Sequence, residues 1–145
     1  MATMKKNMSI EQMLGNCITD MLFYVNQLHY THWLTLKNHH HVVVGELYEA
    51  LEEELDELAE QYLGACLPEM KPEEALNSEM STEEPRYFSV VKSEAEILAL
   101  IEEITRRANK GLGLVENEPK FAFMRDTIMD LIAELHSAKY KITQE

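Results

Sequence analysis

Residues that interrupt helices are scarce in this chain, because only five of its 145 residues are Gly and four are Pro. No Pro falls inside a periodic apolar segment, which favours long helices over many short strands. The two cysteines, Cys17 and Cys66, are too few for a disulfide framework and lack CxxC spacing. These scarcities exclude a disulfide-stapled fold and predict a helical domain with free, buried thiols.

Long apolar runs are also scarce. No apolar run approaches the roughly 20 residues that a membrane-spanning helix needs, and the N-terminus lacks the apolar stretch of a signal peptide. We therefore expect no membrane association and a cytoplasmic location, in the cytoplasm of a host cell if the gene is viral.

The charge is strongly acidic, with 13 Lys and Arg against 26 Asp and Glu and a formal net charge of −13. Such a surface repels nucleic acid and suits cations or basic partners. Simple solubility is the plainer explanation of the same charge. Of the few basic residues, Arg106, Arg107 and Lys110 are expected on a solvated face near a helix C-terminus.

Four amphipathic segments account for most of the chain. Apolar residues recur at alternating steps of three and four, the spacing that places them on one helix face. This spacing predicts helices over about residues 9–36, 40–67, 93–115 and 119–143. Ser9 with Gln12, and Ser93 with Glu96, have the capping-box spacing, which supports helix starts at both serines.

The second of the three links is long, rich in Glu, Ser and Thr, and has room for a short helix at 72–76. The chain has the usual length of one domain, so we expect a single domain over residues 1–145. Four helices bury their apolar stripes by packing together, and a long link between the second and third is typical of ferritin-like bundles. The prediction is an all-α, ferritin-like four-helix bundle with a long crossover between helices 2 and 3.

Histidines gather at the end of the first predicted helix. Five of the six lie between His29 and His41. His29 and His32 are three residues apart and share a helix face, and Trp33 follows. Two alternatives stay open, because His29 can equally be a core histidine bonded to a carbonyl group and residues 39–41 can be an exposed loop.

Carboxylates follow on the second predicted helix. Asp56 and Glu60 are four residues apart and project together, and Glu52 and Glu49 extend this acidic stripe back toward His41. A stripe of this kind is most often a solvated helix face. Placed against histidines from another helix, however, mixed imidazole and carboxylate groups suit a divalent iron or zinc ion.

The order of these groups resembles the Dps miniferritins, the ferritin-like proteins of starved bacteria. The run from His29 to Trp33 is similar to the H-x-x-H-W run near the end of that family's first helix, and residues 56–60 are similar to a D-E-I-A-E-like run in its second. Counting back from Asp56, His41 falls where the family has its second-helix histidine ligand. Residues 130–136 are similar to a D-L-I-x-E-L-H stretch, so the resemblance covers most of the chain.

The resemblance implies an iron-oxidising cage whose ferroxidase centre lies between two subunits. Its ligands would be His32 and His41 from one chain and Asp56 and Glu60 from the two-fold partner. Secondary candidates from the residues themselves are His29, Glu49 and Glu52. The implied metal is iron, with zinc or another divalent ion as the alternative at the same site. The implied partner is a second copy, joined through helices 1 and 2, with dimers assembling into a larger shell.

Three features depart from the family's pattern. Its acidic ligand one turn after the second-helix histidine falls here on Gly45, where Glu49, one turn further on, substitutes only with rearrangement. The loop between His32 and His41 is shorter than usual by about three residues. The basic tail that many members use for DNA is absent, with only Lys5 and Lys6 present, so nucleic-acid binding is not expected.

These departures keep a second hypothesis open, namely a degenerate ferritin-like bundle that acts as an acidic structural or protein-interaction module without catalysis. A third hypothesis, a metal-dependent hydrolase or oxygenase within one bundle, lacks the second Glu-x-x-His pair of an intrasubunit di-iron site. A large assembly that turns over iron(II) separates the first hypothesis from the second.

Overall fold

A computed structural model describes residues 8–77 and 87–144 of the chain. Within those ranges it contains helices and connecting segments and no β-strand. The long helices are α2 (Ile10–Leu34), α3 (Asn38–Cys66), α5 (Glu94–Glu116) and α6 (Arg125–Ile142), and the short elements are α4 (Pro72–Ala75) and the 3-10 helix η2 (Pro119–Met124). The prediction of an all-helical protein is confirmed for the described part.

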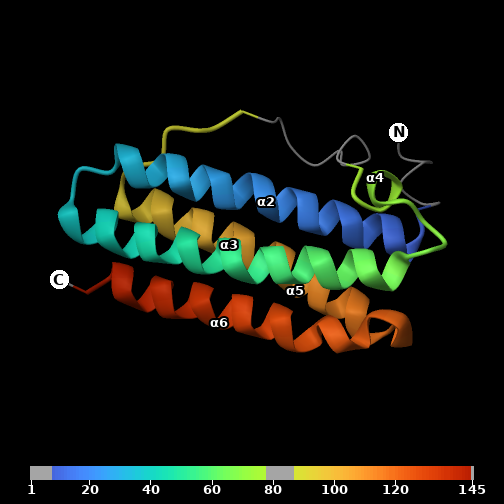
Figure 1. Ribbon diagram of the computed structural model, residues 1–145. Coiled ribbons are helices and arrows are strands. Elements are labelled where there is room, and N and C mark those ends of the chain that lie inside the picture. Colours follow the sequence, from blue (N-terminus) through green and yellow to red (C-terminus); the bar gives the residue numbers. More distant parts are fainter. Residues whose placement is uncertain (1–7, 78–86, 145) are drawn as a thin grey trace.

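The four long helices lie side by side (Figure 1). α2 packs against α3 and α5, and α6 packs against the same two helices. α4 contacts α2 and α3 at the end of the bundle where α2 begins and α3 ends. After the long connection, the chain from Tyr87 onward runs along α2 before it enters α5. None of the helices in the described ranges is both long enough and apolar enough to cross a membrane.

The predicted helix starts at Ser9 and Ser93 are confirmed. Each Ser Oγ accepts a hydrogen bond from the backbone N–H three residues on, at 3.1 Å from Gln12 and 3.2 Å from Glu96. The glutamine and glutamate side chains accept in return from the serine N–H groups, which completes both capping boxes. Local hydrogen bonding therefore fixes these two boundaries.

Two other boundaries differ from the prediction. The break after the first helix lies at residues 35–37, so residues 39–41 belong to the first turns of α3 and are not an exposed loop, and His40 is buried. The fourth predicted helix is divided, because Pro119–Met124 forms a 3-10 helix and the α-helix begins at Arg125. Phe121 and Met124 are both fully buried, and the three-residue repeat of a 3-10 helix places them on the same side.

The apolar stripes form one continuous core, and Cys17 and Cys66 are buried free thiols as predicted. The expectation of a solvated face is wrong for Arg107, which is only 3% exposed. Arg107 follows Ile104 by three residues, so it shares the core-facing side of α5. Its Nη1 donates to Asp20 Oδ2 of α2 at 2.9 Å, and its Nε donates to Glu103 Oε2 at 2.9 Å. A buried ion pair therefore joins α2 to α5.

Candidate functional site

His32 and His41 form a reciprocal pair where α2 ends and α3 begins. Nδ1 of His32 lies 2.8 Å from the backbone oxygen of His41, and Nδ1 of His41 lies 2.8 Å from the backbone oxygen of His32. The two rings stack with centroids 3.9 Å apart and an interplanar angle of 17°. Because a carbonyl oxygen only accepts, each Nδ1 carries a proton, and the lone pair of each neutral ring is on Nε2. Metal-ligating histidines are held in this way, with the second nitrogen donating to a carbonyl group.

Gly45 provides the space that the His32 ring occupies. A Cβ atom at position 45 would lie 2.7 Å from Cε1 and 2.9 Å from Nδ1 of His32. Position 45 is where the Dps resemblance calls for an acidic ligand. In this chain that volume is filled by the imidazole ring, so a longer side chain at position 45 requires the ring to move.

His29 lies in an aromatic cluster on the same side of the two helices. Its ring stacks on Tyr48, with centroids 4.1 Å apart, and lies 4.7 Å from the ring of Trp33. The ring of Tyr48 lies 5.4 Å from that of His32. Desolvation, followed by the nearby charges of Glu49 and Glu52, raises the pKa of the Tyr48 phenol. The cluster connects the histidine pair to Trp33, whose side chain is exposed.

Asp56 and Glu60 are exposed on α3 and lie far from the histidine pair of their own chain. At 1.5 Å per residue, the fifteen positions between His41 and Asp56 span about 22 Å along the helix. Glu49 and Glu52 lie between them, also exposed. No cluster of three or more His, Cys, Asp and Glu side chains in the described part of the chain is arranged to hold a metal ion. A site built from both the histidines and these carboxylates therefore needs a second chain.

An apolar hollow beside Asp56 was not predicted from the sequence. It has a volume of about 210 Å³ and lies between Ile18 and Leu22 of α2 and Leu55 and Ala59 of α3. Leu22 is 50% exposed at its edge. One sequence feature could have indicated the hollow. Leu22 is a large apolar residue one position beyond the buried stripe of α2.

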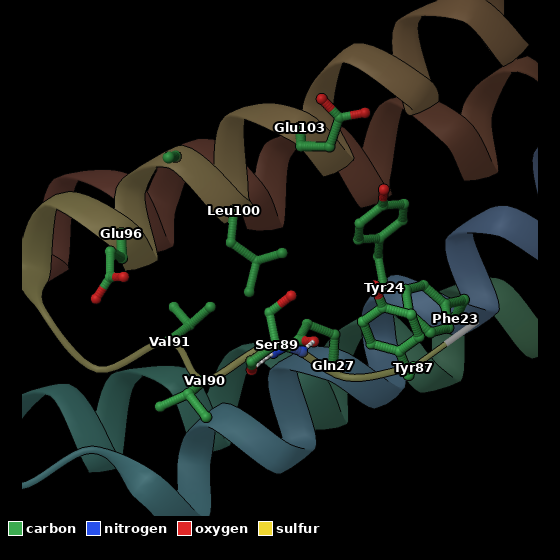
Figure 2. A pocket seen from close by; sticks show the side chains of 11 residues that line it. Phe23, Tyr24, Gln27, Tyr87, Ser89, Val90, Val91, Glu96, Leu100 and Glu103 are labelled. Atoms are coloured by element: carbon green, nitrogen blue, oxygen red, sulfur yellow. Dashed lines mark hydrogen bonds between the residues drawn. The ribbon is translucent and has the colours of Figure 1, made fainter. Parts of the chain in front are cut away.

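A larger cavity of about 500 Å³ lies between α2 and α5 (Figure 2). One wall is the segment 87–91, which is held against α2 by hydrogen bonds between Gln27 and Ser89. The Gln27 side chain donates to the backbone oxygen of Ser89 at 2.9 Å and accepts from its N–H at 2.8 Å. Phe88 stacks on both Phe23 and Tyr30, with centroids 5.5 and 5.4 Å apart. This wall was also missed by sequence reasoning.

The carboxylates around this larger cavity accept hydrogen bonds that stabilise the fold. Glu103 accepts hydrogen bonds from Arg106 and Arg107, and these interactions, led by the one from Arg106, lower its pKa. Glu96 completes the Ser93 capping box, and the Ser93 backbone N–H lowers its pKa. We therefore place the candidate site on the α2–α3 face and not in this cavity.

Comparison with known proteins identifies no relative, since no family model, curated protein or solved structure matches this chain. Evidence of function therefore comes from the chain's own residues. Of those predicted as ligands, His32 and His41 lie together, while Asp56 and Glu60 form a separate exposed pair at the far end of the same helix face.

Gly45→Ala is expected to lower the free energy of unfolding by about 1–2 kcal/mol, because overpacking and the loss of the His32 hydrogen bond outweigh the gain in helix propensity of about 1 kcal/mol. Gly64→Ala is the matched control in the same helix. Nothing lies within 4 Å of a Cβ atom at position 64, so this change is expected to stabilise by about 0.5–1 kcal/mol. Urea unfolding at fixed protein concentration measures both, and equal stabilisation by the two alanines would contradict the role given to Gly45.

Proposed function

We propose that this chain is a Dps-like, ferritin-like bundle that binds and oxidises iron(II) at sites shared between two copies. The observation that carries the proposal is the reciprocal pairing of His32 and His41, which holds both rings with Nδ1 protonated and Nε2 able to bind metal. Two imidazoles with two carboxylates are ligands of the kind that non-haem iron sites use.

The ligand pairs lie at opposite ends of one face, and this arrangement suits a two-fold pair of copies. If a two-fold axis passes perpendicular to α3 between Tyr48 and Glu49, His41 of one copy lies level with Asp56 of the other. Contacts across such an axis occur twice, so each pair of copies gains two equal sites. The same axis places Glu52 of the second copy level with Gly45, where the acidic ligand of the Dps pattern is missing.

Iron(II) is the substrate in this proposal. The imidazole nitrogens of His32 and His41 favour the divalent ion, and the carboxylates of Asp56 and Glu60 favour the harder ferric product. A molecule of peroxide takes one electron from each of two iron(II) ions and, with two protons, leaves as two molecules of water. The acidic surface, with its net charge of −13, attracts the incoming cations.

The test combines native mass with iron oxidation. We expect a large assembly that oxidises iron(II) with peroxide, and we expect His32→Ala with Asp56→Ala to abolish that turnover by removing one ligand of each type. His136→Ala with Asp126→Ala is the matched control, because both residues are exposed on α6, away from the site, and its turnover should equal that of the unchanged protein. A small oligomer without iron in anomalous scattering would contradict the proposal.

A second candidate function is an acidic structural or protein-interaction module without catalysis. It is favoured by Gly45, because the His32 ring fills the place of a ligand and the two Nδ1–carbonyl hydrogen bonds also serve to join α2 to α3. Under this alternative, iron(II) leaves the thermal unfolding midpoint unchanged. Under the first, bound metal raises that midpoint, by an amount that grows with the logarithm of the metal concentration divided by its dissociation constant.

A further inference from the structure

The larger cavity, between α2 and α5, has a wall that contacts within the chain hold in place. Its volume of about 500 Å³ lies within the range of small-molecule sites. The wall segment 87–91 is held by Gln27, which is only 3% exposed and pairs with both backbone groups of Ser89. If the segment moved away, the buried Gln27 amide would lose these two hydrogen bonds, which is unfavourable. The wall is therefore preformed, and little conformational entropy is lost when a ligand binds against it.

Apolar and aromatic side chains make up most of the cavity lining. Figure 2 shows Glu96 and Val91 at one end, the Tyr24 ring at the other, and Leu100 between them. Glu96 and Glu103 both line the cavity and are seven residues apart, so it extends about 10 Å along α5. This shape suits a molecule with an apolar ring at one end and a polar group at the other.

The charged residues among the described lining are both acidic, Glu96 and Glu103. Glu103 forms ion pairs with Arg106 and Arg107, which compensate its charge. Glu96 forms no ion pair within the described part of the chain, and the hydrogen bonds that it accepts from the Ser93 N–H and hydroxyl both reach Oε1. The second oxygen, Oε2, accepts no hydrogen bond from the described residues. Glu96 therefore has one carboxylate oxygen with which to bind a cation at its end of the cavity.

We propose that this cavity binds a small arylalkylamine, with the ligand's ammonium group at Glu96 Oε2 and its ring between Leu100 and Tyr24. A ring in this place leaves water and packs beside another aromatic side chain, which is favourable. The ammonium group donates a charge-assisted hydrogen bond to the carboxylate. A ligand of the same shape with a carboxylate in place of the amine would be repelled by Glu96. The inference depends neither on iron nor on a second copy of the chain.

Ligand-observed fluorine NMR tests the site in the full chain, with para-fluorophenethylamine as the probe and para-fluorophenylpropionate as its matched anion. We expect the amine to bind saturably with a millimolar dissociation constant and the anion to bind several-fold more weakly. Ala99→Trp, at an exposed residue of the lining, fills the cavity and is expected to abolish saturable binding of the amine. Ala133→Trp, at an exposed alanine of α6, is the matched control and should bind like the unchanged protein. Absence of saturable binding, or binding that persists in Ala99→Trp, would overturn the inference.

A second pair of variants separates the Glu96 carboxylate from the overall negative charge. Glu96→Gln removes the charge and keeps the capping box, since Gln12 completes the equivalent box at Ser9. We expect it to weaken amine binding about three- to fivefold. Glu116→Gln, at an exposed residue in the last turn of the same helix, changes the net charge equally and should leave binding unchanged. Equal weakening by both variants would mean that only the overall charge attracts the amine, and would overturn the inference.

Discussion

Asp20→Ala is expected to lower the free energy of unfolding by about 3–5 kcal/mol, because it leaves a buried guanidinium without its buried partner. Arg107 Nη1 lies 2.9 Å from Asp20 Oδ2, and the two side chains are 4% and 6% exposed. Arg107 also lies 4.8 Å from the centre of the Tyr24 ring, which cannot replace a carboxylate. A domain of this size has about 5–15 kcal/mol of stability in total, so the expected loss is a large part of it.

Glu103→Ala is the control for this prediction. Glu103 also accepts a hydrogen bond from Arg107, but its side chain is 33% exposed. Water therefore replaces much of the interaction that Arg107 loses when the Glu103 carboxylate is removed. We expect a loss of about 1 kcal/mol or less. Replacing Asp20 and Arg107 together with leucine is expected to recover most of the stability, since apolar residues often substitute for a buried ion pair at little cost. Urea unfolding measures all three variants, and an Asp20→Ala cost no larger than that of Glu103→Ala would contradict the burial of the pair.

Two inactive variants are expected to restore iron oxidation when their chains are mixed. His32→Ala with His41→Ala keeps the carboxylates, and Asp56→Ala with Glu60→Ala keeps the histidines. After subunit exchange at equal concentration, half of the two-fold pairs contain one chain of each kind, and each such pair has one complete site of two. The mixture should therefore recover about a quarter of the wild-type sites, a value that follows from the two-fold symmetry of the contact.

The control for the mixing experiment is each variant exchanged with itself, which should stay inactive. Native mass spectrometry shows whether mixed pairs have formed. Mixed pairs without any recovery of turnover would mean that the histidines and carboxylates do not meet across an interface. Activity in either variant alone would mean that the site does not require both ligand types.

The sequence predicted the elements of this fold well wherever the determining interactions are local. The Ser9 and Ser93 capping boxes act within four residues, and both helices begin where the spacing indicated. The short helix after Pro72 is also found, at Pro72–Ala75. Where a boundary depends on packing, the prediction was wrong, as at η2, whose 3-10 turn is set by the burial of Phe121 and Met124.

The candidate site was predicted only as a set of residue types. His32 and His41 were found as candidates, but their reciprocal hydrogen bonds and the role of Gly45 depend on how closely α2 and α3 approach each other. Arg107 was predicted to lie on a solvated face. Its partner Asp20 is eighty-seven positions away in sequence, so spacing along one helix does not reveal the ion pair. The hollow beside Asp56 is likewise formed by residues of α2 and α3 together with Leu76, which follows α4, and the position of Leu22 alone does not reveal it.

The sequence by itself thus determined that the chain forms helices, where two of them begin, and which residue types could bind a metal, because these properties depend on spacing along one helix. Only the tertiary structure decided which of those residues lie together, because contacts between helices depend on side chains far apart in sequence. It brought the two histidines together at one end of the α2–α3 face and left the carboxylates at the other. That separation, about 22 Å along a rigid helix, is the physical reason why the proposed site requires a second copy of the chain.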